Sequence, residues 1–307
     1  MSSNIILNKK NIVGSDNNHL VYEFINEQHF DEGDSIGITH LNIYNSFFNI
    51  TQKNNNNFLQ YKFWDSTGNL ATFDVNIQDG YYSIIQLYEI ILSKMKTNNH
   101  YLISPTGNEV YFFELKSNSV YYSTFIRLYS VNKFMTFDGV QYNIESDLVT
   151  SYRIPRISGG TLAWVPPQEY YECPQIIIPS TNNFGELLGF KKGSIIQYDS
   201  SSDIINKYYD ILSDTAPIME PQSSFLLTCN MIENKLFNPN NVIMAFTNVS
   251  NYGETISPIK EVIYSDIKPG NYRYIELKFY DQNFNELIIK DPTMLIVVSI
   301  IKNKKQL

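Results

Sequence analysis

The fold is decided by residues 268–300, which read KPGNYRYIELKFYDQNFNELIIKDPTMLIVVSI. Ile275, Leu277 and Phe279 alternate with charged or polar neighbours. This period of two predicts a strand with one buried face and one face in water. After a turn, residues 294–301 are apolar on both faces, which is typical of a central strand covered from two sides. The stretch therefore predicts sheet structure.

The strand pattern recurs on both sides of one well-marked helix. Before the helix we expect four strands, near residues 19–24, 36–50, 59–63 and 73–77, and after residue 222 we expect five more. Of the 307 residues 14% are aromatic, and aromatic and β-branched side chains favour sheets. Eight or nine antiparallel strands suffice for a jelly roll. The predicted fold class is mainly all-β, an antiparallel jelly-roll β-sandwich with an inserted domain of mixed α+β or β structure.

The helix is predicted at residues 80–96, which read GYYSIIQLYEIILSKMK. Its apolar residues recur at the 3.6-residue spacing of one helix face. Ser83 and Gln86 have the spacing of a capping box, which marks the start of the helix. A single helical turn is expected at residues 184–190, ending at Gly189, and the Ser-, Asp- and Pro-rich residues 193–222 are expected to be a loop.

These elements predict a discontinuous domain organisation. Residues 1–18 are polar and weakly patterned, so we expect a flexible arm. Residues 19–78 and 216–307 are expected to form the jelly roll, and residues 79–215 the insertion. The last residues, 302–307, are expected to be a second flexible end.

Charge and composition bear on several classes of partner. The formal net charge is −8, whereas binding to nucleic acid needs clustered Lys and Arg. The only basic cluster is Lys302, Lys304 and Lys305, so no specific nucleic-acid partner is expected. No signal peptide or transmembrane segment is expected either. The sparse pair Cys173 and Cys229 fits a reducing compartment better than a disulfide framework.

We expect no catalytic, cofactor-binding or metal-binding residues, and hence no enzyme and no cofactor. The four histidines, His19, His29, His40 and His100, share no metal-ligand spacing. The stretch 189–194, GFKKGS, resembles a phosphate loop but lacks the G-K-[ST] order.

Two further features have a functional and a structural interpretation. Residues 281–286 begin like a calcium loop, but Gly is missing at its sixth position and Pro292 stands where the bidentate Glu belongs, so a hairpin turn is favoured. Trp64 and Trp164 are candidates for stacking on sugars, although such residues are more often core or interface residues. The structural interpretation is preferred for both.

Three motifs in this order, residues 80–96, 183–190 (NFGELLGF) and 268–300, resemble the penton (vertex, minor capsid) proteins of virophages and Polinton-like viruses. The resemblance covers most of residues 79–301. It implies a virion structural protein at the capsid vertex, made in the host cytoplasm, which forms a homo-pentamer and contacts trimers of the major capsid protein. A host receptor, contacted through the insertion, is a further candidate partner.

Three other interpretations stay open. The main alternative is a virion receptor- or glycan-binding β-sandwich, as in a spike or a lectin-like module. A major capsid protein would carry two jelly rolls and usually needs far more than 307 residues. A β-rich enzyme would need a catalytic constellation, and the sequence shows none.

Overall fold

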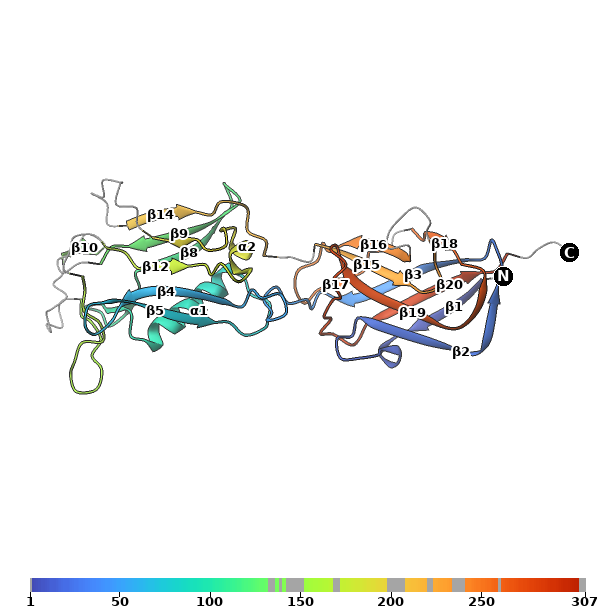
Figure 1. The fold of residues 1–307 in the computed structure, drawn as a ribbon, viewed down its shortest axis with the longest axis horizontal. Helices are drawn as coiled ribbons and strands as arrows, with labels where there is room; N and C mark the ends of the chain where they lie inside the picture. Colours follow the sequence, from blue (N-terminus) through green and yellow to red (C-terminus); the bar gives the residue numbers. More distant parts are fainter. Residues whose placement is uncertain are drawn as a thin grey trace. The chain divides into compact units, whose positions relative to one another are not determined.

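The structure, a computed structural model, describes residues 2–131, 136–137, 140–141, 152–167, 172–197, 208–219, 223–233, 241–258 and 261–303. It contains two compact units (Figure 1). The first, the jelly-roll unit, comprises Met1–Phe48 and Gln222–Leu307, and the second, the insertion unit, comprises Asn49–Pro221. The chain leaves the jelly-roll unit once and returns to it once.

The jelly-roll unit consists of two antiparallel sheets. The first, called the β1 sheet, has the strand order β1-β20-β3-β17, with β18 also paired to β3. Its strands are β1 (Ser2–Leu7), β20 (Leu295–Ile301), β3 (Ser35–Tyr44), β17 (Thr255–Ile256) and β18 (Tyr264–Asp266). The second, called the β2 sheet, has the order β16-β15-β19-β2. Its strands are β16 (Val242–Thr247), β15 (Ser224–Cys229), β19 (Gly270–Asp281) and β2 (His19–Phe30).

The order of these strands is that of a jelly roll. Among the described residues, and with β17 and β18 taken as one interrupted strand, the unit has eight strands along the chain. The β1 sheet contains the first, eighth, third and sixth of them, and the β2 sheet contains the second, seventh, fourth and fifth. Two four-stranded sheets connected as Greek keys define the jelly roll. The predicted fold class is confirmed.

Alternation of side chains explains how the two sheets enclose a core. Ile275, Leu277 and Phe279 of β19 are fully buried, whereas Glu276 and Lys278 between them are partly exposed, as the sequence predicts. β20 lies between β1 and β3, so its central position is confirmed. Its cover from two sides is only partial, because Leu295, Val297 and Ile301 are half-buried.

The insertion unit has its own sheets and helices. Its larger sheet has the order β13-β12-β4-β5 and the smaller has the order β14-β9-β8. The strands are β13 (Ile195–Ile196), β12 (Gln175–Ile177), β4 (Phe58–Trp64), β5 (Leu70–Asn76), β14 (Tyr208–Leu212), β9 (Ser123–Tyr129) and β8 (Phe113–Asn118). Two short hairpins are β6 (Leu102–Ile103) with β7 (Glu109–Val110), and β10 (Thr136–Phe137) with β11 (Val140–Gln141).

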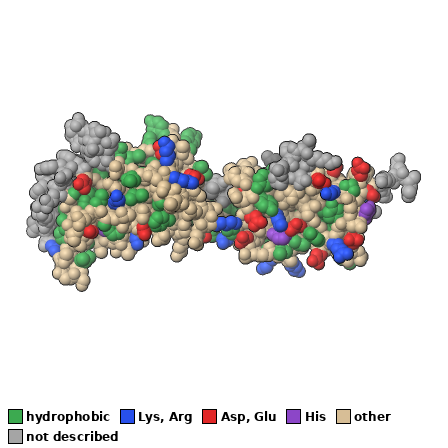
Figure 2. All heavy atoms as spheres, in the orientation of Figure 1, with side chains coloured by type: hydrophobic (Ala, Val, Ile, Leu, Met, Phe, Trp, Pro, Cys, Tyr) green, Lys and Arg blue, Asp and Glu red, His purple; other side chains and the backbone are tan. Residues whose placement is uncertain are grey.

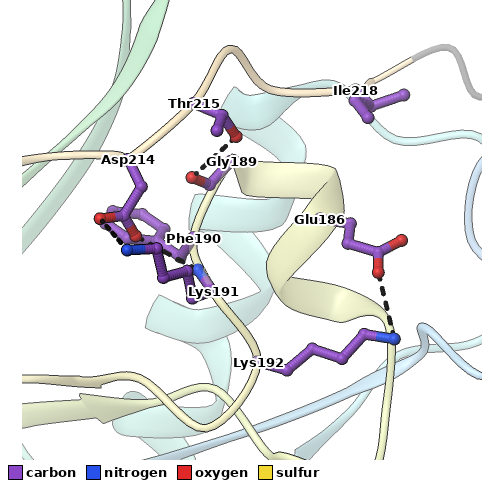
Figure 3. Close-up of a pocket in the computed structure, with 8 residues that line it drawn as sticks. All are labelled: Glu186, Gly189, Phe190, Lys191, Lys192, Asp214, Thr215 and Ile218. Atoms are coloured by element: carbon purple, nitrogen blue, oxygen red, sulfur yellow. Dashed lines mark hydrogen bonds and ion pairs between the residues drawn. The ribbon is translucent and has the colours of Figure 1, made fainter.

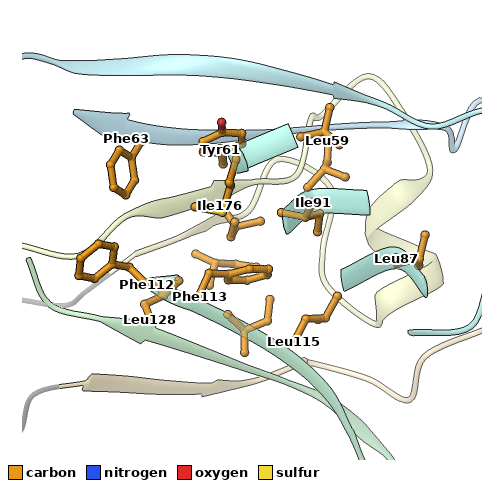
Figure 4. Packing of buried hydrophobic residues seen from close by; sticks show 14 of the residues in the cluster. Leu59, Tyr61, Phe63, Leu87, Ile91, Phe112, Phe113, Leu115, Leu128 and Ile176 are labelled. Carbon is orange, nitrogen blue, oxygen red and sulfur yellow. The ribbon is translucent and has the colours of Figure 1, made fainter. Parts of the chain in front are cut away.

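The core of the insertion unit lies between these two sheets and the helix α1 (Ile84–Thr97). Figure 4 shows side chains of β4, α1, β8 and β9 pointing toward one another. The predicted capping box is confirmed. The backbone N–H of Gln86 donates to Ser83 Oγ (3.3 Å), and the backbone N–H of Ser83 donates to Gln86 Oε1 (2.9 Å). The predicted helical turn is α2 (Phe184–Leu188), which ends at Gly189.

The structure corrects the predicted domain boundaries. The insertion runs from residue 49 to 221 rather than from 79 to 215. β4 and β5, which were expected in the jelly roll, belong to the insertion unit, because β4 pairs with β12 through Tyr61 and Ile176. A period of two in the sequence marks a strand but does not identify its partner.

Both expected flexible ends also need correction. Residues 2–7 form β1, which pairs with β20 along its whole length. A 3₁₀ turn, η1 (Lys9–Asn11), follows β1, and the side chain of Asn8 caps it. Lys302 donates to the backbone oxygen of His29 (3.0 Å), and the Asn303 N–H donates to Asp34 Oδ1 (2.8 Å). Residues 304–307 lie outside the described residues.

Two smaller differences concern individual strands. The segment 193–222, which was expected to be a loop, contains the two strands β13 and β14, and its residues 198–207 and 220–222 lie outside the described residues. The strand expected at residues 286–289 is reduced to one bridge between Tyr280 and Glu286.

Candidate functional site

The histidines do not form a metal site in the structure. His100 is buried in the insertion core, where its Nδ1 lies 2.9 Å from the Tyr61 hydroxyl and its ring stacks on Phe63 at 4.6 Å. Burial lowers the pKa of His100 to about 4, so its ring is neutral at physiological pH. His19 Nε2 lies 2.8 Å from Glu276 Oε1. Among the described residues no group of three or more His, Cys, Asp or Glu could hold a metal ion.

The other singled-out residues are also parts of the two cores. Cys173 and Cys229 are free and buried, and burial raises the pKa of each thiol to about 12. Both are therefore protonated at neutral pH, and a thiol rather than a thiolate is a poor nucleophile. Trp64 and Trp164 are almost fully buried, so neither offers a face on which a sugar can stack.

Residues 189–192 of the stretch 189–194 line a shallow hollow of about 280 Å³ in the insertion unit (Figure 3). Its two lysines already have acidic partners. Lys191 Nζ lies 3.8 Å from Asp214 Oδ1, and Lys192 Nζ lies 3.1 Å from Glu186 Oε1. Because both cations are neutralised by side chains of the same hollow, the loop has no surplus positive charge to hold a phosphate.

Residues 281–286 form a turn, as the sequence predicts. The carboxylate of Asp281 accepts hydrogen bonds from the backbone N–H groups of Asn283 (2.8 Å) and Asn285 (2.9 Å). This is the usual hydrogen bonding of an Asp that begins a turn. The carboxylate of Asp281, the first of the groups that resembled calcium ligands, therefore stabilises the turn itself.

Charged side chains are unevenly distributed over the strands of the jelly-roll unit. β1, β20 and β3, which make up most of the β1 sheet, contain no Asp, Glu, Lys or Arg and one histidine, His40, and the edge strand β18 adds Asp266. β2 and β19 of the other sheet carry several, namely His19, Glu23, Glu27, His29, Arg273, Glu276, Lys278 and Asp281. Figure 2 shows acidic, basic and histidine side chains scattered over the jelly-roll unit, on the side where β2 and β19 lie in Figure 1. The β1 sheet thus presents an almost uncharged surface.

In the described part of the insertion unit, exposed apolar residues are concentrated at the tip of the β8–β9 hairpin. Val120, Tyr121 and Tyr122 are consecutive, and their side chains are 78%, 69% and 78% exposed. Asn118 Oδ1 accepts hydrogen bonds from the backbone N–H groups of Val120 (3.1 Å) and Tyr121 (3.3 Å), which stabilise the turn at the tip. Figure 2 shows hydrophobic atoms at this tip. Contiguous exposed apolar residues mark interaction sites.

The described residues offer two surfaces for contact with other proteins: an almost uncharged sheet and an apolar hairpin tip. Sequence reasoning predicted neither, because both depend on which strands are neighbours and which side chains are exposed. None of the described helices is long and apolar enough to cross a membrane. The class defined by the fold is an all-β protein with a jelly roll interrupted by a second folded unit.

Comparison with solved structures finds 24 matching chains, and two of these matches are described here. No protein-family model and no curated protein sequence matches the chain. The crystal structure of the selenomethionine-labelled mavirus penton protein covers 98% of this chain and 97% of its own, with a TM-score of 0.45 and 9% identity. The cryo-EM structure of the Sputnik virophage covers 93% of this chain and 98% of its own, with a TM-score of 0.35 and 11% identity.

One of these structures is a penton protein and the other is a virophage structure. Virophage penton proteins are the class that the three sequence motifs resemble. Both TM-scores are below 0.5, so neither superposition supports a conclusion about function. The jelly-roll assignment rests on the strand order of this chain.

Proposed function

We propose that the chain is a structural protein of a virus capsid: a penton that forms pentamers at the fivefold vertices and contacts the major capsid protein. The observation that carries the proposal is the complete jelly-roll strand order, interrupted between β3 and β15 by the insertion unit. The three motifs at residues 80–96, 183–190 and 268–300 support it, because their order resembles that of virophage pentons. The jelly-roll unit would form the base of the pentamer.

The surface of the jelly-roll unit suits assembly. A fivefold ring needs two different patches on each copy, since contacts around the axis are head-to-tail. With a net charge of −8 per chain, copies repel one another, and this repulsion is weakest when the surfaces that face each other carry no charge. The β1 sheet supplies such a surface, and charged residues are depleted at the centres of protein interfaces.

The mass of the purified protein tests the pentamer. We expect light scattering after size-exclusion chromatography to give five times the chain mass of 35.6 kDa, and negative-stain images to show fivefold rings. A strict monomer or a trimer would contradict the proposal. Co-expression with a major capsid protein then tests the vertex position: particles with the chain should have density on their fivefold axes, and particles without it should have open vertices.

A second function, attachment to a host receptor, is favoured by the exposed tip Val120–Tyr122 in the insertion unit. Tyrosine is enriched where proteins make contacts. The double variant Tyr121→Ser/Tyr122→Ser should reduce binding of the protein to host cells at least tenfold without changing its mass. The matched control is Tyr252→Ser in the jelly-roll unit, which also removes an exposed tyrosine. Equal cell binding by both variants would contradict this second function.

A further inference from the structure

The edge strands of the two jelly-roll sheets are of two kinds, blocked and open. An edge strand offers unpaired backbone N–H and C=O groups to any other strand, and proteins block such edges with charges, bulges or very short strands. The β1 sheet ends at β1 on one side and at β17 and β18 on the other. The β2 sheet ends at β16 and at β2.

Two of these edges are blocked. β2 carries Glu23 and Glu27 and has a bulge: Gln28 pairs with Tyr272 but Glu23 pairs with Tyr274, so three extra residues are accommodated on β2. The bulge leaves the side chain of Ile25 97% exposed. At the far edge of the β1 sheet, β17 has two residues and β18 has three, too few for a long ladder.

The other two edges are open. β1 (SSNIIL) and β16 (VIMAFT) have six residues each and contain no proline and no charged residue. Among the described residues β1 pairs only with β20, and β16 pairs only with β15. The exposed side chains of Ile6 and Ala245 flank these two free edges.

The two open edges lie on opposite sides of the sandwich. β1 is in contact with β2, whereas β16 is in contact with β3, which pairs with β17 and β18. Each side of the unit therefore has one open and one blocked edge, and the open edge belongs to a different sheet on each side. Two different complementary patches on opposite sides are what a head-to-tail ring requires.

We infer that β1 of one copy pairs with β16 of the next copy, so that backbone hydrogen bonds join neighbouring jelly rolls around the ring. Six residues correspond to a ladder of about 20 Å, and strand addition of this kind is an established mode of protein association. A second copy of this chain is favoured as the partner over a charged protein, because β1 and β16 are both uncharged and are equal in length. The inference rests on the proposed pentamer and names the contact that builds it.

The test uses lysine substitutions at exposed positions of both open edges. Ile6→Lys and Ala245→Lys should each reduce the assembly to the mass of a single chain, because a charge at an edge blocks pairing. Ile25→Lys on the blocked edge β2 is the matched control and should keep the mass of the wild type. Circular dichroism and thermal melting establish that each variant is folded. Asn4→Lys and Thr247→Lys, also at exposed positions, replace any variant that is not.

Mixing the two variants distinguishes this contact from the alternatives. The Ile6→Lys copy keeps an intact β16, and the Ala245→Lys copy keeps an intact β1, so an equimolar mixture should give dimers of twice the chain mass. A mixture that stays monomeric, or variants that keep the wild-type mass, would overturn the inference. Variants that assemble normally alone but fail to enter particles would assign the edges to a different capsid protein and also overturn it. A monomeric wild type would instead refute the pentamer itself.

Discussion

Tyr61 and His100 form a polar contact inside an aromatic core. The ring of His100 stacks on Phe63 and meets the edge of Phe73 at 4.4 Å, and the Tyr61 hydroxyl also accepts a hydrogen bond from Asn98 (2.7 Å). Burial of these groups favours their neutral forms, since it raises the pKa of Tyr61 and lowers that of His100 from 6.5 to about 4. The pair therefore couples the stability of the insertion unit to pH.

The sign of that coupling follows from which state binds the proton first. Below pH 6.5 the unfolded chain protonates His100 while the folded chain does not, so the free energy of unfolding falls as the pH drops from about 6.5 toward 4. The full loss is about 3 kcal/mol. Denaturant titrations at pH 7 and pH 4.5 measure most of this loss, which is complete only below the folded-state pKa of about 4. His100→Asn, which cannot titrate, should lose less stability between these pH values, and an equal loss in both proteins would contradict the prediction.

Gly189 ends α2 at a position that only glycine fits. Its φ is +80°, and a Cβ there would overlap the backbone oxygen of Thr215. Gly189→Ala should therefore destabilise the insertion unit by more than the roughly 1–2 kcal/mol of the left-handed conformation alone. Gly107 is the control, because it has a φ of +84° and no atom within 4 Å of its Cβ position. Equal losses in urea titrations of Gly189→Ala and Gly107→Ala would refute the steric argument.

Among the elements, α1 begins at a capping box that can be weakened without touching the core. Ser83→Ala removes the acceptor for the Gln86 N–H and should cost about 1 kcal/mol. Ser93 lies at an exposed position away from the ends of the same helix. Ser93→Ala should be neutral or stabilising by a few tenths of a kcal/mol, because Ala has the higher helix propensity. Urea titrations of both variants measure the difference, and a loss for Ser93→Ala as large as that for Ser83→Ala would contradict the assignment.

Elements with a strong local signal could be predicted from sequence, and elements made by long-range pairing could not. α1, α2 and β19 have the spacing, capping or alternation that local sequence encodes. β1 was missed because its exposed half is serine and asparagine, and it becomes a strand only by pairing with β20, almost three hundred residues away. β14 lies in a polar stretch and is likewise fixed by pairing with β9. The open edges of β1 and β16 depend on these pairings, so they could not be predicted from the sequence.

At the scale of the whole molecule, the sequence predicted that a jelly roll is interrupted but placed the interruption one hairpin too late. β4 and β5 alternate like jelly-roll strands, and nothing in residues 58–76 shows that their partner is β12. The boundary at residue 49 is marked by tertiary contacts instead: the Asn49 side chain donates to the backbone oxygens of Tyr82 (2.8 Å) and Met219 (2.9 Å). The two ends of the insertion unit are thereby tied together.

The two units have separate cores, and the two ends of the insertion unit lie close together. We therefore predict that the units unfold independently. Leu87 of α1 is fully buried in the insertion core, so Leu87→Ala should destabilise that unit by about 2–5 kcal/mol and leave the jelly-roll unit unchanged. Leu277→Ala in β19, equally buried in the other core, is the reciprocal control. Hydrogen exchange followed by mass spectrometry reads both units in one experiment: each variant should raise exchange only in its own unit. Exchange that rises across the whole chain in either variant would show that the two cores unfold as one.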